Sequence, residues 1–252
     1  MASPSVNLQK AYPEMAAGGF SRVDGTIEFY TRLNALLDPS MRVLDIGAGR
    51  GAQLLSPAAP FKSALAKVQG KVQRLVGADI DPAVLGHPFL DEAHVIHANS
   101  PLPFDDSAFD LVYADWVLEH VHRPEPFAQE ILRVLRPGGW FCARTPNRWG
   151  MTGVAARLVP NRLHSRLLRH LQPDRQEHDV FPTAYRLNTR RQVRRYFGMP
   201  DWEDFSYLHN PEPPYVQRSK LLIAIAKLFF RLAPESLATN LHIFARKKPN
   251  AS

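Results

Sequence analysis

Between about residues 41 and 145, short apolar runs rich in β-branched residues alternate with segments of helical spacing. The apolar runs predict five strands, over 41–46, 74–79, 94–98, 109–114 and 139–145. Strands that alternate with helices form βαβ units, so the pattern predicts an α/β fold with a largely parallel sheet.

Apolar residues at helical spacing predict three helices, over 26–37, 127–135 and 217–232. The helix expected after the first strand starts at Arg50, and Pro57 and Pro60 interrupt it, because proline cannot continue a helix interior. Residues 202–208 and 241–246 supply two more strands near the end of the chain.

We therefore expect a Rossmann-like, seven-stranded, mostly parallel sheet with helices on both faces and a basic cap of helix and loop inserted after the fifth strand. The expected divisions are an N-terminal lid and helix (1–40), the ligand-binding core (41–147), the basic cap (148–200), and the strands and helix that complete the sheet (201–252). The cap is too long for an ordinary connection, and such excursions commonly form a lid or a substrate wall.

Charge is concentrated in that cap. The chain has 31 basic and 24 acidic side chains, a formal net charge of +7. Ten arginines and three acidic residues fall between Arg157 and Arg195, so this segment alone carries the excess. The charge favours anionic partners, although a basic helical face that only meets solvent would look the same.

Composition narrows the class of protein. The lone cysteine, Cys142, excludes a disulfide framework and argues against a Cys-rich metal site, so we expect a cytoplasmic protein without a metal. The N-terminus lacks the apolar core of a signal peptide, and no segment is predicted to span a membrane. Peripheral membrane contact through the apolar run 221–230, which has basic flanks, is a minority interpretation.

The chemistry starts at residues 43–51, VLDIGAGRG, where a buried strand ends in an acidic residue and enters a glycine turn. Glycine lets the backbone approach a ligand closely and adopt positive φ. The spacing differs from that of a dinucleotide fingerprint, and Asp45 would sit poorly beside phosphate. A ligand with a cationic sulfonium and an ammonium group fits better, which points to S-adenosylmethionine (SAM).

A second marker follows at residues 75–82, LVGADIDP. The carboxylate of Asp79 ends a strand where acidic residues of doubly wound folds accept hydrogen bonds from ribose hydroxyls. We expect Asp79 to bind the ribose and Ile80 to lie against the adenine.

Four further motifs follow in order, LPF at 102–104, SAFDLV at 107–112, VLEHV at 117–121 and EILRVLRPGG at 130–139. With the two markers, they make residues 43–147 resemble the class I SAM-dependent methyltransferases, in particular the small-molecule, type 11-like branch that includes quinone-biosynthesis enzymes. The resemblance implies SAM as methyl donor, S-adenosylhomocysteine as product and no metal. The cofactor-binding residues it implies are Asp45, Gly47, Ala48, Gly49, Gly51, Asp79, Ile80, Asn99, Ser100, Asp115 and Trp116.

The sequence departs from the family pattern in two places. Members often carry an acidic residue after the third strand, where this chain has Asn99 and Ser100. The interval between Gly51 and Asp79 is also longer and contains prolines.

Catalytic and substrate residues are less strongly indicated. His120 and His178 are candidates for a general base, because imidazole titrates near neutrality and an oxygen acceptor must lose a proton. For His120, a structural role at the end of a short helix is favoured over the catalytic one. Tyr185, Arg186 and Arg190 are candidate substrate contacts, since arginine binds phosphate or carboxylate bidentately.

The sequence thus predicts methyl transfer from SAM to a small molecule, with an oxygen of an anionic sugar or lipid-linked intermediate as the favoured acceptor. A nucleic-acid methyltransferase would explain the net charge, but few aromatic residues lie among the arginines. A non-catalytic SAM-binding protein is the third alternative, because fold does not settle function.

Overall fold

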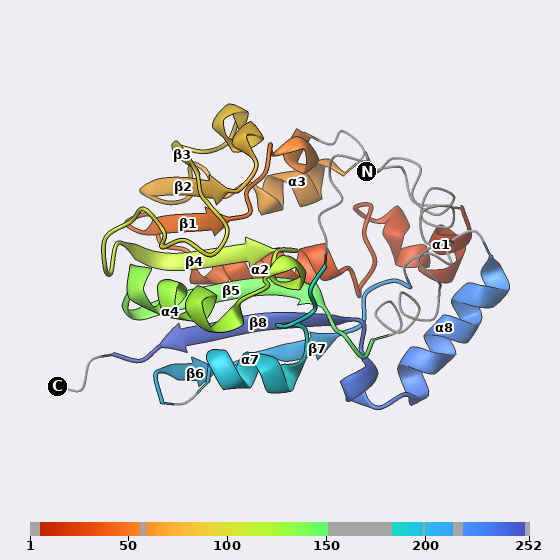
Figure 1. The fold of residues 1–252 in the computed structure, drawn as a ribbon. Coiled ribbons are helices and arrows are strands. Elements are labelled where there is room, and N and C mark those ends of the chain that lie inside the picture. The colour runs from red at the N-terminus through yellow and green to blue at the C-terminus, as the bar shows by residue number, and fades with distance from the viewer. Residues whose placement is uncertain (1–5, 56–58, 151–182, 199, 214–218, 250–252) are drawn as a thin grey trace.

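The computed structural model describes residues 6–55, 59–150, 183–198, 200–213 and 219–249. His178 and most of the predicted cap lie outside these residues. Figure 1 shows one sheet with helices on both of its faces.

The sheet has the order β3-β2-β1-β4-β5-β8-β6, with β7 paired to β8. The strands are β1 (Arg42–Ile46), β2 (Arg74–Asp79), β3 (Glu92–Val95), β4 (Phe109–Asp115), β5 (Leu135–Pro146), β6 (Trp202–Asp204), β7 (Tyr207–His209) and β8 (Asn240–Lys247). The first five are parallel, and β8 is antiparallel to β5, β6 and β7. The predicted Rossmann-like α/β sheet is confirmed.

One predicted strand is broken. The segment 202–208 forms β6 and β7, which pair with opposite ends of β8. The Asp204 carboxylate accepts a hydrogen bond from the backbone N–H of Ser206, 2.9 Å away. This local side-chain bond competes with the ladder and interrupts the strand.

The described α-helices are α1 (Val6–Ala11), α2 (Gly25–Leu36), α3 (Pro60–Ala66), α4 (Pro124–Val134), α7 (Arg190–Tyr196) and α8 (Lys220–Leu232). Helix α2 starts where the Asp24 carboxylate accepts the N–H groups of Thr26 and Ile27, a typical N-cap. The predicted break in the first crossover is also confirmed, because a short 3₁₀ helix (Ala52–Leu55) precedes α3, which begins at Pro60.

Alternate side chains of the central strands point to opposite faces of the sheet and build two cores. Leu44, Val112 and Phe141 pack on the face that α4 and α7 cover. Val43 and Leu111 pack on the face that α2 and α3 cover. Burial on both faces explains why these strands read as nearly continuous apolar runs.

The stretch from Thr183 to Gly198 belongs to the first of these cores. Leu187, Val193 and Phe197 are fully buried, and the ring of Phe197 stacks on that of Phe141, with 4.6 Å between ring centroids. The described end of the predicted cap is therefore packed against the sheet.

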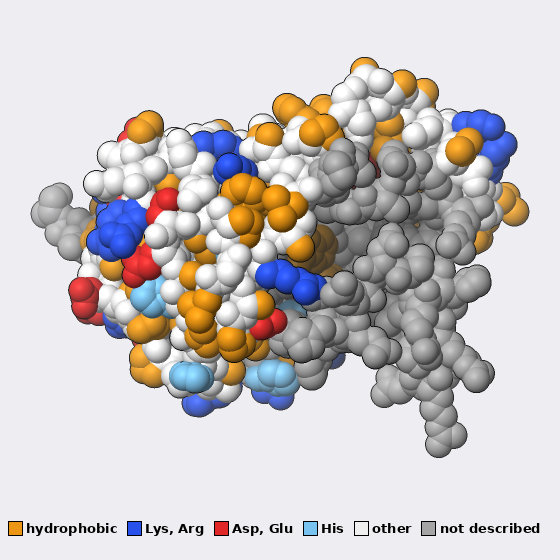
Figure 2. Space-filling view, turned by 90° about the horizontal axis from the view of Figure 1, so that it is seen from above, with side chains coloured by type: hydrophobic (Ala, Val, Ile, Leu, Met, Phe, Trp, Pro, Cys, Tyr) orange, Lys and Arg blue, Asp and Glu red, His pale blue; other side chains and the backbone are white. Residues whose placement is uncertain are grey.

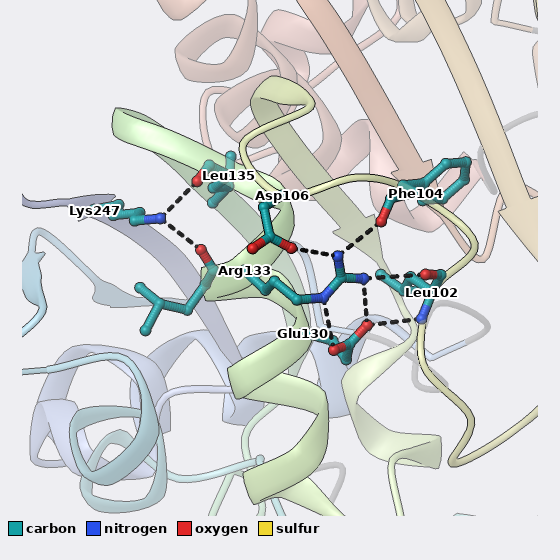
Figure 3. A network of polar contacts seen from close by, with 8 residues as sticks. Leu102, Phe104, Asp106, Glu130, Arg133, Leu135 and Lys247 are labelled. Atoms are coloured by element: carbon teal, nitrogen blue, oxygen red, sulfur yellow. Dashed lines mark hydrogen bonds and ion pairs between the residues drawn. The ribbon is translucent and has the colours of Figure 1, made fainter.

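Arg133 of α4 fastens the loop before β4 to that helix (Figure 3). Its guanidinium donates to both carboxylate oxygens of Glu130, to the carbonyl oxygens of Leu102 and Phe104, and to the carboxylate of Asp106, over 2.7–3.0 Å. Glu130 in turn accepts the backbone N–H of Leu102 at 2.7 Å. The motifs at 102–104 and 130–139 are thus two halves of one structural contact.

Candidate functional site

The glycine turn lies at the carboxyl end of β1 and has a left-handed backbone. Gly47, Gly49 and Gly51 have φ values of 76°, 57° and 66°, which L side chains rarely adopt. A Cβ at Gly47 would also overlap the side chain of Val117. Ala48, between the first two glycines, is buried. The turn therefore exposes backbone where side chains would block a ligand.

Asp79, at the carboxyl end of β2, fixes this turn. One carboxylate oxygen accepts the N–H of Gly49 and the other accepts the N–H of Asp81, both at 2.8 Å. The N–H of Gly47 donates to the carbonyl oxygen of Ala78 at 2.7 Å. The predicted ribose ligand and the glycine turn are thus parts of one structure.

Asp45 lies beneath the turn and is held by a phenol. The hydroxyl of Tyr113 donates to its carboxylate at 2.7 Å. Burial, reinforced by the neighbouring carboxylates of Asp115 and Asp79 and opposed by the Tyr113 bond, raises the pKa of Asp45 to about 7. A cationic ligand nearby would favour the ionised form.

Asp115, at the carboxyl end of β4, is paired with a buried arginine of β5. Nε and Nη2 of Arg144 each donate to one Asp115 oxygen at 2.7 Å, and the Tyr30 hydroxyl adds a third bond at 3.1 Å. Nη1 of Arg144 donates to the hydroxyl of Thr26 at 2.9 Å. Burial works to lower the pKa of Arg144, and the Asp115 carboxylate more than offsets this, so the pKa is raised.

Sequence reasoning missed Arg144. A single charge within the apolar run 140–145 is a signal that could have found it, since a buried charge needs a partner.

Two of the predicted cofactor residues have strained backbones. Trp116 has φ 60°, and its N–H donates to the carbonyl oxygen of Arg144 at 2.9 Å, while the Arg144 guanidinium lies 5.0 Å from its ring centroid. Asn99 has φ 65° and is exposed beside Ser100, in the turn that follows β3. Such strain concentrates at functional sites.

Ile80 leaves the same edge of the sheet as an apolar side chain that is 48% exposed. An exposed aliphatic surface directly after Asp79 is suited to contact with a flat ring. The structure thus brings most predicted cofactor residues to the carboxyl ends of β1, β2 and β4.

His120 ends a short 3₁₀ helix (Leu118–His120) after β4. Its neighbour Glu119, which the sequence did not single out, is buried and accepts a hydrogen bond from the Thr145 hydroxyl at 2.9 Å. The amide of Asn188 donates to the same hydroxyl at 2.7 Å. These hydrogen bonds tie the described end of the predicted cap to the ends of β4 and β5.

A hollow of about 570 Å³ opens beside the end of β5. It is lined by Asn147, Arg148, Trp149, Thr189, Arg190, Arg191, Gln192, Leu208, Glu235 and Ser236. The buried Nε atoms of Arg148 and Arg190 have no hydrogen-bond partner among the described residues. Glu235 lies 3.9 Å from Arg190, measured from carboxylate oxygen to Nη1.

The three predicted substrate residues do not lie at one site. Arg190 lines the hollow, whereas Arg186 donates from Nη1 to the carbonyl oxygen of His122 at 3.0 Å. Tyr185 has φ 51° and its N–H donates to the carbonyl oxygen of Glu119. Of these three residues, Arg190 alone is among the described residues that line the hollow.

Comparisons with known proteins agree with this geometry. Residues 44–143 match the model of a methyltransferase domain family. The chain is 36% identical over 128 residues to a probable S-adenosylmethionine-dependent methyltransferase of Mycolicibacterium smegmatis, covering 48% of this chain and 43% of the relative. It is 27% identical over 110 residues to the ubiquinone/menaquinone biosynthesis C-methyltransferase UbiE of Vibrio vulnificus, covering 40% and 39%.

Among solved structures, a SAM-dependent methyltransferase of Methanosarcina mazei shares the fold, with a TM-score of 0.52 and 17% identity, over 87% of this chain and 98% of that one. The chain spans less than half the length of each of the two relatives from Mycolicibacterium smegmatis and Vibrio vulnificus. The matched segment contains the glycine turn, Asp79 and Asp115, and it ends one residue before Arg144. Residues 44–143 therefore match a methyltransferase domain, and the sheet around them has the fold of a SAM-dependent methyltransferase.

Proposed function

We propose that this chain transfers a methyl group from SAM to a small molecule that carries an anionic group. The observation that supports this most strongly is the left-handed glycine turn, which Asp79 holds at the carboxyl ends of the parallel strands. In open α/β sheets, ligands bind at this edge. When bound, SAM supplies an electrophilic methyl group on a sulfonium.

The cofactor role of each residue follows from its chemistry and position. Gly47 is exposed and a Cβ at Gly49 would meet no atom within 4 Å, which leaves room for the methionine part, and Asp45 offers it a carboxylate. Asp79 has a free lone pair on each oxygen for the ribose hydroxyls.

Ile80, after β2, and Asn99, after β3, would contact the adenine, with Ser100 at the rim. Asp115 and Trp116 would form the floor near the methyl group. Asp115 would act there as a neutralised group, because Arg144 pairs with both of its oxygens.

The hollow beside β5 supports an anionic acceptor. Arg148, Arg190 and Arg191 line it, and a single carboxylate, Glu235, faces these three cations among the described lining residues. The unpartnered Nε donors of Arg148 and Arg190 are suited to the oxygens of a phosphate or carboxylate.

The acceptor atom that we favour is oxygen, with His120 as the candidate base in the described part of the chain and His178 as the candidate outside it. Carbon is the second candidate, because one relative is named a C-methyltransferase. In either case, catalysis rests mainly on holding donor and acceptor in line, which contributes roughly 7–11 kcal/mol.

The test uses SAM with an isotope-labelled methyl group and a small-molecule extract separated by anion exchange. Label should appear in a compound that the anion exchanger retains, and carbon NMR of the product distinguishes an O-methyl from a C-methyl group. Label only in unretained compounds would contradict an anionic acceptor. Label in RNA, assayed in parallel, would show that the acceptor is a nucleic acid and not a small molecule.

The same assay tests the hollow. Arg148→Ala with Arg190→Ala should lower incorporation at limiting acceptor about tenfold or more, because charge-assisted bonds to the anion are lost, while SAM binding stays unchanged. Arg194→Ala is the matched control, since this arginine of α7 bonds Asp204 instead. Equal incorporation by wild type and the double variant would contradict the assignment.

A further inference from the structure

Helix α8 exposes a broad apolar surface. Leu221, Ile225, Leu228 and Leu232 are 69%, 54%, 56% and 72% exposed. These four residues recur at spacings of four and three, so they form a single stripe along the helix. Leu222 and Phe229 widen the stripe on one side and are also exposed.

A different stripe of the same helix attaches it to the protein. Ile223 and Ala226 are buried, and Phe230 is half-buried. With 3.6 residues per turn, this attachment stripe lies about 160° around the helix from the exposed one. Packing against the body of the protein therefore accounts for one side of α8 and leaves the other uncovered in the described structure.

The remaining side of the helix is basic. Lys220, Lys227 and Arg231 lie within about 40° of one another at 100° per residue. Lys227 donates to the carbonyl oxygen of Ala11 at 2.8 Å, which joins α8 to α1, where Lys10 adds an exposed cation. Helices α1 and α8 contain no acidic residue.

These two helices lie beyond the carboxyl ends of the parallel strands, the edge of the sheet where the glycine turn lies (Figure 1). At this end of the molecule, Figure 2 shows hydrophobic and basic side chains next to one another. The chain continues from α8 through Pro234 to Glu235 and Ser236, which line the hollow beside β5.

We infer that α8, with α1, is a docking surface for an anionic lipid bilayer. An apolar stripe bordered by lysine and arginine matches a helix that lies in the plane of a membrane, its apolar side among acyl chains and its cations at anionic headgroups. The 13 residues of α8 are too few to cross a bilayer. None of the helices in the described part of the chain is long and apolar enough to span one.

Charge decides between a bilayer and a second copy of the chain. Two α8 helices packed together would bring the Lys220 and Arg231 side chains of both copies, four cations, close to one another with no acid on either helix to pair with them. Anionic headgroups complement the same cations. The docking does not depend on the acceptor, and it would hold the hollow near a membrane surface.

The test is flotation of the whole protein with vesicles of phosphatidylcholine alone or with about a third phosphatidylglycerol. We expect binding to the anionic vesicles only, and release on raising NaCl from roughly 50 to 500 mM, because salt screens the headgroup contacts. Ile225→Gln with Leu228→Gln should weaken the partition by about tenfold or more, since both side chains are exposed and only the bilayer would bury them.

Lys220→Gln with Arg231→Gln should remove the preference for anionic vesicles. Leu85→Gln is the matched control, because Leu85 is 64% exposed on a different surface and should leave binding unchanged. SAM binding, measured on each variant, separates a failure of docking from a failure of the cofactor site.

Wild-type protein that stays with neither vesicle would overturn the inference. So would a dimer, measured by sedimentation velocity, that Ile225→Gln with Leu228→Gln dissociates while vesicle binding is absent. Equal flotation of wild type and this double variant would show that other residues bind the bilayer.

Discussion

Three carboxylates at the ends of β1, β2 and β4 are held by three different kinds of partner. Asp45 accepts from the phenol of Tyr113, Asp79 accepts from backbone N–H groups, and Asp115 pairs with a guanidinium. Of these three carboxylates, Asp115 alone pairs with a cation in the described part of the chain. Asp45, whose pKa is raised to about 7, is therefore the group most open to a cationic ligand.

That raised pKa predicts a pH dependence of SAM affinity. A cation favours ionised Asp45, so binding above pH 7 meets a carboxylate that is already ionised, and binding below pH 7 must release a proton. Affinity should be constant above pH 7 and fall by about tenfold per pH unit well below it.

Calorimetry between about pH 5.5 and 8, in buffers of different ionisation enthalpy, measures both the affinity and the proton release. Asp45→Asn should bind more weakly at neutral pH and lose the dependence. A wild-type affinity that does not change over this range would contradict the role given to Asp45.

The Asp115–Arg144 pair leads to a second prediction, which concerns the stability of the fold. Arg144→Met leaves a buried carboxylate without its cation and should lower the free energy of unfolding by about 3 kcal/mol. Adding Asp115→Asn removes the stranded charge and should recover a large part of that loss.

Urea unfolding of wild type, both single variants and the double variant gives the coupling energy. If the losses of the two single variants simply added in the double variant, the pair would carry no coupling, and the account of Asp115 would be wrong.

At the residue scale, the sequence predicted what is local. The glycine turn and Asp79 each follow directly from a strand, so their place at the sheet edge could be derived from order along the chain. Arg144 and Asp115 are 29 residues apart and meet only because β4 and β5 pair in one register. The pattern of apolar positions does not encode that register.

At the scale of elements, the Arg133 contact makes α4 a brace for the loop before β4. Lys247 of β8 adds to it from the other side, donating to the carbonyl oxygens of Leu132 and Leu135 at 2.8 and 2.7 Å (Figure 3). The last carbonyls of α4 thereby gain a cationic partner, as helix ends favour.

Arg133→Lys should lower the free energy of unfolding by about 2 kcal/mol, because lysine cannot reproduce the planar set of donors that serves Glu130 and the loop carbonyls. Arg136→Lys is the matched control. Its side chain is 55% exposed and pairs with Asp110 at the surface, so it should cost less than about 0.5 kcal/mol. Denaturant unfolding compares them, and equal losses would refute the bracing role.

The order of elements was predictable because each strand and helix carries its own periodicity. The break between β6 and β7 was not, since it depends on one aspartate side chain that replaces a ladder bond. The hollow beside β5 was not predictable either, because its walls come from the segment after β5, from α7 and the residue before it, from β7, and from the segment after α8.

In the molecule as a whole, the basic lining of the hollow and the basic residues of α8 lie toward the same side as the glycine turn. Arg148, Arg190 and Arg191 line the hollow, and the basic side of α8 lies beyond the same edge of the sheet. An anionic acceptor and an anionic surface would both be drawn toward the carboxyl ends of the strands. Among the described residues, three arginines of this basic region thus line the hollow.

Calorimetric binding of SAM to wild type, Asp79→Ala and Asp81→Ala tests the cofactor site, with circular dichroism to show that each protein is folded. Wild type and Asp81→Ala should bind SAM, and Asp79→Ala should bind about a hundredfold more weakly, because two charge-assisted hydrogen bonds to the ribose are lost. Folded wild-type protein that does not bind SAM, or Asp79→Ala that binds as tightly as wild type, would contradict the proposed site.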